Sequence, residues 1–193
     1  MAGGSIYDAD SVGLILNRLA ADIGPQMKWD GLHVETDSHG SFSLRKAHRS
    51  WANELMLGAL DYYAAAEVPA YQIVPDPEHL TIDVPNMTEP WHPRIALPWQ
   101  WLREQWNYPV PPDSVATTNL QALRGERITE AARWEEDQWE LFAGAGPDVP
   151  KEDVRVVPLG TLLAADDSLD PVVHLPVGSG LWRDANSEWQ RWN

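Results

Sequence analysis

The hydrophobic positions at the start of the chain follow the 3.6-residue period of an amphipathic helix. Asp10 or Ser11 offers a side chain suited to the N-cap, and a Gly-Pro pair at residues 24–25 ends the pattern. We therefore predict a helix over residues 12–23. Its inner positions are Val12, Ile15, Leu16, Leu19 and Ile23.

Alternating residues after this helix predict a small antiparallel meander. An Asp-Gly pair at residues 30–31 suits the positive φ angles of a tight hairpin turn, with strands over residues 26–29 and 32–37 on either side. A third strand over residues 41–45 follows.

The next pattern predicts a second helix and a second hairpin. Ser50 can cap a helix over residues 51–66, which ends before a Val-Pro pair. Two alternating runs at residues 71–74 and 79–84 flank a Pro-Asp-Pro-Glu turn and predict strands. The inner positions of this helix are Trp51, Leu55, Ala59, Tyr62 and Ala66.

Residues 87–112 are dense in proline and tryptophan, and Pro98 can start a short helical turn there. These tryptophans suit either the filling of a seam between two halves of the fold or the anchoring of a protein partner. Residues 113–127 have no firm periodicity, so we expect them to bridge the two halves.

Residues 129–142 favour a third helix, with Thr129 as its cap. Ala131, Trp134, Gln138, Leu141 and Phe142 mark its inner side. Its outer side is acidic, which is typical of a solvated face and also suits contact with a basic partner. The acidic positions are Glu135, Glu136, Asp137 and Glu140.

The last forty residues predict a strand over residues 154–157, a short helical turn from Thr161, and a stop at residues 166–168. Asp170 and a following proline can start another turn, in which we expect His174 to be packed or hydrogen-bonded. Runs at residues 179–183 and 188–192 predict a closing hairpin. It carries Trp182, Trp189 and Trp192.

These elements predict an α+β fold, in which small antiparallel sheets pack with three or four helices and a β-hairpin ends the chain. We expect an N-terminal α+β domain over residues 1–86, a Pro/Trp-rich connection over residues 87–128, and a C-terminal region over residues 129–193.

The C-terminal segment has a Leu-rich turn, an Asp-Asp-Ser-Leu sequence, a Leu-Pro-Val-Gly loop, and an Arg-Asp pair before a Trp-rich end. This combination resembles a family of bacterial immunity proteins of polymorphic toxin systems, first catalogued as a domain of unknown function. The resemblance covers about forty of 193 residues. It implies a cytoplasmic antidote that binds a toxin and blocks it.

The charge of the chain is strongly one-sided, with 29 acidic against 14 basic residues and a net charge of −15. Such a surface repels nucleic acid and anionic lipid, because phosphate contacts require a basic footprint. It attracts basic partners, although net charge also simply keeps soluble proteins apart.

Several kinds of chemistry are missing from the sequence. Because it contains no cysteine, it has no disulfide, thiolate metal site or cysteine nucleophile. The nucleophile elbow, Walker loop, dinucleotide-binding glycines and zinc-protease helix are also absent. No basic leader precedes an apolar stretch. We therefore expect a cytoplasmic binding protein without a cofactor or catalytic residues.

One polar pattern supports an alternative. His33, Glu35, Asp37 and His39 alternate along the second predicted strand, so they can share one face. Imidazole and carboxylate groups are zinc or iron ligands, and a metal-dependent hydrolase is the competing hypothesis. The plain interpretation is a solvated strand face.

As an antidote, the chain would use acidic side chains and tryptophans to cover the active site of a toxin that has a basic surface. The candidate partner-binding residues are Trp182, Trp189, Trp192, Asp166, Asp167, Arg183, Glu135, Glu136 and Glu140.

Overall fold

A computed structural model describes residues 4–24, 27–36, 39–184 and 187–192. The chain forms two compact units. Unit 1 consists of Met1–Leu80 and Val84–Ala96, and unit 2 of Thr81–Asp83 and Leu97–Asn193. The region expected to connect two domains therefore does not stand apart, because most of it belongs to unit 2.

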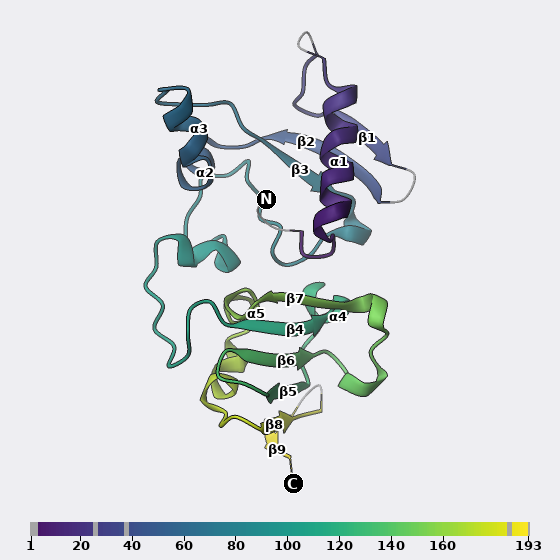
Figure 1. Ribbon diagram of the computed structural model, residues 1–193, viewed down its shortest axis with the longest axis vertical. Helices are drawn as coiled ribbons and strands as arrows, with labels where there is room; N and C mark the ends of the chain where they lie inside the picture. Colours follow the sequence, from purple (N-terminus) through teal and green to yellow (C-terminus); the bar gives the residue numbers. More distant parts are fainter. Residues whose placement is uncertain (1–3, 25–26, 37–38, 185–186, 193) are drawn as a thin grey trace. The chain divides into compact units, whose positions relative to one another are not determined.

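Unit 1 packs one long helix on a three-stranded antiparallel sheet (Figure 1). The helix α1 (Ala9–Asp22) starts three residues before its expected position, because Asp8 caps it by accepting a hydrogen bond from the Ser11 amide at 2.7 Å. The strands are β1 (His33–Thr36), β2 (Gly40–Lys46) and β3 (Tyr71–Pro75). The core between helix and sheet consists of Ile15, Leu19, Val34, Phe42 and Leu44.

The Asp-Gly pair does not make the expected hairpin. Residues 27–29 are not a strand, and residues 25–26 lie outside the described part of the chain. Gly31 does have a positive φ of 83°, but its amide bonds to the Leu44 carbonyl at 2.8 Å. The pair therefore places the chain beside β2, just before β1 begins. The hairpin forms at the next connection, between β1 and β2.

The expected helix over residues 51–66 is two short helices, α2 (Arg49–Leu55) and α3 (Leu57–Tyr62), separated at Met56. The imidazole of His48 caps α2, because the Ser50 hydroxyl accepts a hydrogen bond from the Trp91 amide instead. No residue of α3 is buried. The expected core position Tyr62 is exposed.

The expected strand over residues 79–84 is also wrong. A 3-10 turn, η1 (Pro77–His79), follows β3, and the next residues leave unit 1. The alternation is reversed: Leu80 is exposed, whereas Thr81 and Asp83 are buried and hydrogen-bonded to each other at 2.5 Å. The Ile82 amide bonds to the Leu123 carbonyl of unit 2.

Unit 2 contains a six-stranded mixed sheet in the order β7-β4-β6-β5-β8-β9 (Figure 1). β4 and β6 are parallel, and the other pairs are antiparallel. The strands are β4 (Val115–Asn119), β5 (Glu130–Arg133), β6 (Gln138–Phe142), β7 (Val154–Pro158), β8 (Ser179–Trp182) and β9 (Gln190–Arg191). The helices are η2 (Leu97–Leu102), α4 (Leu120–Leu123), η3 (Gly146–Asp148), η4 (Lys151–Asp153), α5 (Leu159–Ala165) and η5 (Asp167–His174).

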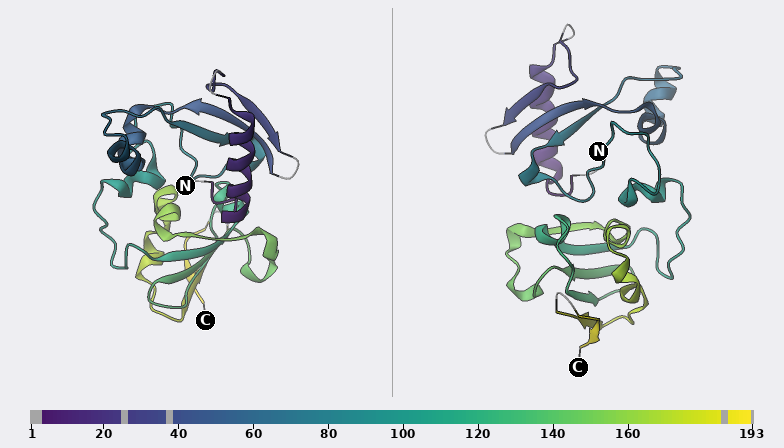
Figure 2. Two further views of the ribbon diagram at one scale, coloured as in Figure 1. Left: turned by 45° about the horizontal axis from the view of Figure 1, so that its top comes forward. Right: turned by 180° about the vertical axis from the view of Figure 1, so that it is seen from behind.

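One face of this sheet builds the core of unit 2. Ala116, Leu141 and Ala131 lie on that face in adjacent strands, and each is fully buried. The helices α5 and η5 supply the apolar side chains that pack in the same core, and Figure 2 shows α5 lying against the sheet.

The segment expected to be a third helix is the β5–β6 hairpin. Ala131 and Leu141 pair across it, and Trp139 is 1% exposed. The hydrophobic positions of this segment fit a helical period, but in the structure the segment forms two paired strands on either side of a turn. The expected bridge over residues 113–127 contains β4, which is central because it pairs with both β6 and β7.

The C-terminal segment follows the expected order. β7, α5, a stop at Asp166, a 3-10 helix and the β8–β9 hairpin succeed one another, although Pro158 and Asp166 stand at the N-caps where Thr161 and Asp170 were expected. His174 is exposed rather than packed. The α+β class is confirmed, with one antiparallel and one mixed sheet. None of the described helices is long and apolar enough to cross a membrane.

Candidate functional site

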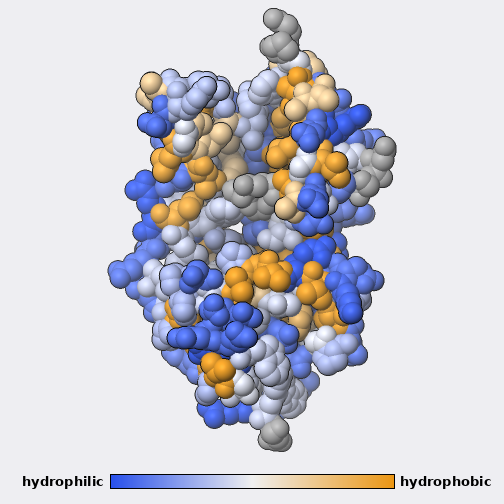
Figure 3. All heavy atoms as spheres, viewed as in Figure 1, coloured by the Kyte–Doolittle hydropathy of each residue, from blue (hydrophilic) through white to orange (hydrophobic). Residues whose placement is uncertain are grey.

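The outer face of the six-stranded sheet, opposite the core, carries part of the predicted partner-binding set. Residues paired across neighbouring strands share a face. One row therefore runs across the outer face through Val156, Thr117, Glu140, Ala132 and Gly180. Val156 is 66% exposed at one end of the row, and on the same face η3 lies against Phe142 of β6. Polar residues cover most of unit 2 in the view of Figure 3, with smaller apolar patches between them.

Three exposed tryptophans gather at the other end of this row. The Trp192 amide bonds to the Gly180 carbonyl at 3.1 Å, and its indole lies against Gly180, where a larger residue would not fit. Trp182, two residues after Gly180, points to the same face. Trp134 contacts Trp192, with ring centroids 6.1 Å apart. The exposed fractions of Trp134, Trp182 and Trp192 are 48%, 41% and 38%.

The acidic residues Glu135 and Glu136 stand beside Trp134 in the turn between β5 and β6, and both are exposed. Arg133 holds this turn from behind. Its Nε and Nη2 atoms donate to the Glu135 and Glu136 carbonyls at 3.2 and 2.6 Å, and its guanidinium lies 4.6 Å from the Trp139 ring. The turn is thereby fixed while its carboxylates face solvent. We call Trp134, Glu135, Glu136, Glu140, Trp182 and Trp192 the tryptophan surface.

Sequence reasoning identified five of these six residues but placed Trp134 inside a helix. Trp134 instead follows the last residue of β5 and is exposed because the chain leaves the sheet there. The available signal was the two-residue spacing of Ala131 and Arg133 followed by a polar turn, a pattern that predicts a strand and a hairpin.

Three of the four remaining predicted contact residues, Asp166, Arg183 and Trp189, form an internal network around Arg183, whose side chain is 1% exposed. Its Nε donates to the Ile128 carbonyl at 2.7 Å, and Nη1 donates to the Ser168 hydroxyl at 2.8 Å. Nη2 reaches the Asp166 carboxylate at 3.3 Å. Every nitrogen of the guanidinium is thus engaged inside unit 2, so Arg183 supports the fold at this place.

Trp189 closes the same network from the other side. Its ring lies 4.0 Å from the Arg183 guanidinium, and its indole nitrogen donates to the Ser168 carbonyl at 2.8 Å. The Asp166 carboxylate also accepts the amide and hydroxyl of Ser168 and so caps η5. Asp167 is exposed on the first turn of that helix. The structure therefore joins Asp166, Arg183 and Trp189 as scaffold.

The electrostatics of this network are set by burial. Loss of water lowers the pKa of Arg183, and the nearby positive charge of Arg127 lowers it further. The Asp166 carboxylate acts in the opposite direction.

In unit 1, the four predicted metal ligands do not all lie within the described residues, and those that do are not gathered as a metal site. His33 and Glu35 are exposed on β1, as alternation requires, and Asp37 lies outside the described residues. The backbone carbonyl of His39 accepts a hydrogen bond from the Tyr7 hydroxyl at 3.0 Å. Among the described residues, no three histidine or acidic side chains gather as a metal site. The hydrolase hypothesis gains no support from these positions and stays a prediction.

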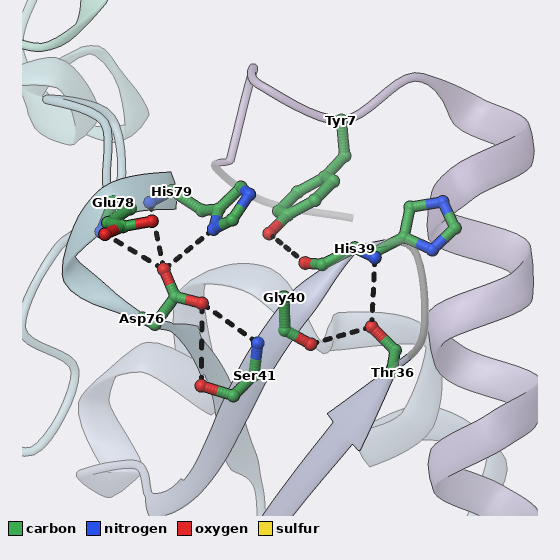
Figure 4. Close-up of polar contacts among 8 residues, drawn as sticks. All are labelled: Tyr7, Thr36, His39, Gly40, Ser41, Asp76, Glu78 and His79. Carbon is green, nitrogen blue, oxygen red and sulfur yellow. Dashed lines mark hydrogen bonds and ion pairs between the residues drawn. The ribbon is translucent and has the colours of Figure 1, made fainter.

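A different polar cluster surrounds Asp76 near these residues (Figure 4). The carboxylate accepts the Ser41 amide at 2.9 Å and contacts the His79 imidazole at 2.7 Å. It also accepts the amides of Glu78 and His79, which caps η1. The Tyr7 ring stacks on His79 with centroids 6.0 Å apart. Sequence reasoning used Asp76 only as a turn residue and missed this role.

Two groups of the Asp76 cluster, Asp76 and Tyr7, have shifted pKa values. The Ser41 amide, followed by the His79 imidazole, lowers the pKa of Asp76 to about 2. Burial raises the pKa of Tyr7 to about 12, and the negative charge of Asp76 adds to this effect. An ionised Asp76 beside a neutral Tyr7 is therefore the stable arrangement over the physiological range, and it ties β3 to β2.

In comparisons with known proteins, no family model matches the chain, and neither the curated proteins nor the solved structures provide a match. The tryptophan surface presents to solvent three aromatic rings and the acidic side chains of the turn between β5 and β6.

Proposed function

We propose that this chain is an immunity protein, which binds a bacterial toxin through the tryptophan surface and covers the active site of the toxin. The observation that carries the proposal is the gathering of Trp134, Trp182 and Trp192, all exposed, beside Glu135 and Glu136. The resemblance of the C-terminal segment to an immunity family supports the same function. Such an antidote acts in the cytoplasm.

The physical roles of the two residue types differ. Aromatic side chains bury a large area with few rotatable bonds, so tryptophans anchor a complex and slow its dissociation. The acidic turn attracts a basic toxin surface and raises the association rate. Because Arg133 already fixes the turn, little conformational entropy is lost when it binds.

The internal network gives Asp166, Arg183 and Trp189 an indirect part in this function. They hold the end of β8 against η5 and so position Trp182 on the sheet. The proposed contact set is therefore the tryptophan surface rather than the whole C-terminal segment.

The first test is growth rescue with the toxin-like protein encoded beside this chain. We expect the chain to restore growth and to form a stable one-to-one complex. A double variant, Trp134→Ala with Trp192→Ala, should weaken the complex at least a hundredfold, mainly by faster dissociation. The control is Tyr62→Ala with Tyr63→Ala, which removes two exposed rings from unit 1. Failure of both rescue and complex formation by the folded chain would refute the proposal.

The charge of the surface is tested separately. Glu135→Lys with Glu136→Lys should lower the association rate about tenfold at low salt and reduce its salt dependence. Glu67→Lys with Glu89→Lys changes the net charge equally at exposed sites of unit 1. Equal effects of the two variants would assign steering to net charge and remove the acidic turn from the interface.

A further inference from the structure

The strand β1 forms one edge of the three-stranded sheet in unit 1 (Figure 1). In an antiparallel pair, the backbone groups of successive residues point alternately toward the partner strand and away from it. The Leu44 amide of β2 donates to the Leu32 carbonyl at 2.8 Å, so Val34, two residues after Leu32, also faces β2. The N–H and C=O groups of His33 and Glu35 therefore point to the open side of β1.

The pairing of β2 with β3 leads to the same assignment. The Asp76 amide donates to the Ser41 carbonyl at 2.9 Å, so the odd-numbered residues of β2 face β3. Its even-numbered residues face β1, and they include Phe42, which lies opposite Val34. Both neighbours of Val34 in β1 are thus turned away from the sheet.

The open side of β1 is less protected than the edge strand β7 of unit 2. At β7 the Val154 carbonyl accepts a hydrogen bond from Nη1 of Arg155 at 2.8 Å, and Pro158 has no N–H to offer. In β1, His33 and Glu35 are exposed, and neither side chain has a hydrogen-bond or ion-pair partner within the described part of the chain. Such an edge can pair with another strand.

The open side of β1 is complementary to a second copy of itself. When two β1 strands pair antiparallel about a two-fold axis at Val34, His33 of each copy lies opposite Glu35 of the other. Each of these pairs exchanges two N–H···O bonds, so the open backbone groups of both residues are used. The same register places an imidazole donor beside a carboxylate acceptor on both sides of the axis.

We propose that the chain forms a two-fold symmetric dimer through β1, which joins the two small sheets into one antiparallel sheet of order β3-β2-β1-β1-β2-β3. The contact is short, so the dimer is weak and reversible. Each copy carries a net charge of −15, and salt screens the repulsion between them. Salt therefore strengthens this dimer, whereas it weakens a complex with a basic toxin. The dimer uses unit 1 and does not depend on the proposed toxin binding.

The test is sedimentation of the full chain at concentrations up to about 1 mM, where weak dimers are detected, together with residue-resolved hydrogen exchange. We expect a monomer–dimer equilibrium that shifts toward the dimer as salt is added. The amides of His33 and Glu35 should exchange about tenfold more slowly in the dimer, while that of Val34, which already faces β2, should change little. A monomer throughout this range, or dimers without protection of these two amides, would overturn the proposal.

An exchange of side chains tests the register. His33→Glu places two carboxylates opposite each other on both sides of the axis, so it should weaken the dimer about tenfold. Adding Glu35→His restores unlike pairs and should restore most of the affinity. His92→Glu makes the same change at an exposed histidine outside β1 and should have little effect.

Circular dichroism verifies that each variant is folded, and Glu35→Lys replaces His33→Glu if the latter is not. Equal effects of His33→Glu and His92→Glu, or no recovery in the exchanged variant, would refute pairing through β1. Protection of the His33 and Glu35 amides only when a toxin is bound would assign this edge to the toxin and would also refute the dimer.

Discussion

The two units each contain one polar cluster that ties a 3-10 helix to a sheet, but the charges at their centres are opposite. In unit 1 the Asp76 carboxylate collects donors from Ser41, Glu78 and His79. In unit 2 the Arg183 guanidinium donates to three acceptors from two separate segments, at Ile128 and at residues 166–168. The side chain of Asp76 is 22% exposed, whereas that of Arg183 is 1% exposed.

This difference determines how each cluster fails. Water can replace some of the hydrogen bonds that the Asp76 carboxylate accepts, and protonation in acid removes the negative charge of this carboxylate. Arginine keeps its charge at any ordinary pH, and water does not readily replace its bond to the Ile128 carbonyl, which is buried. The cluster around Asp76 therefore stabilises unit 1 moderately and in a pH-dependent way. The cluster around Arg183 stabilises unit 2 more strongly and does not depend on pH in the ordinary range.

The largest effect is expected from Arg183→Met, which keeps the length of the side chain but leaves Asp166, Ser168 and the Ile128 carbonyl without their donor. We expect a loss of about 3 kcal/mol in the free energy of unfolding. Hydrogen exchange should locate the loss in unit 2, since exchange reports each region separately. Arg191→Met, at an exposed position, should cost less than about 0.5 kcal/mol. Similar costs for the two variants would refute the scaffold role of Arg183.

A smaller effect is expected from Gly40→Ala in unit 1. Gly40 has a φ of +80°, and a Cβ there would lie 2.5 Å from the Asp76 carboxylate and 2.8 Å from the His79 ring. Gly31 has a similar φ of +83° but open space around it. We expect a cost of about 1 kcal/mol for Gly31→Ala from the backbone alone, and about twice that for Gly40→Ala. Equal losses in the free energy of unfolding for the two variants, measured in urea, would show that the Asp76 cluster accommodates the added methyl group at no cost.

The smallest effect at neutral pH is expected from Asp76→Asn, at about 1 kcal/mol. Its pH dependence is diagnostic. Because the pKa of Asp76 falls from 3.8 to about 2 on folding, the stabilisation is complete above pH 3.8 and disappears as the pH falls toward 2. Unfolding measurements between pH 2 and 6 should show the native chain losing its advantage over the variant in that window. Parallel curves would mean that the Asp76 charge does not stabilise unit 1.

Several elements follow directly from local sequence. The spacing of Val12, Ile15 and Leu19 predicts α1 because helix periodicity and burial coincide there. The order of elements after residue 153 was predicted because proline, glycine and Asp-Asp-Ser each act on the nearest few peptide units. The α+β class follows from the presence of both patterns.

Other elements depend on partners far away in the chain. Residues 129–142 fit a helical period as well as a hairpin, and pairing of β5 with β8, fifty residues later, favours the hairpin. Thr81 and Asp83 became buried because that short segment joins unit 2. Local patterns carry no information about such pairings.

The candidate site divides in the same way. The sequence by itself determined the residue types: acidic side chains and tryptophans in the C-terminal part, with charge suited to a basic partner and no cysteine chemistry. Only the tertiary structure decided that Trp134 and Trp192 share a surface while Asp166, Arg183 and Trp189 form its support. The physical reason is that strand register and burial, which assign each side chain to solvent or to core, arise from contacts between residues distant in the chain.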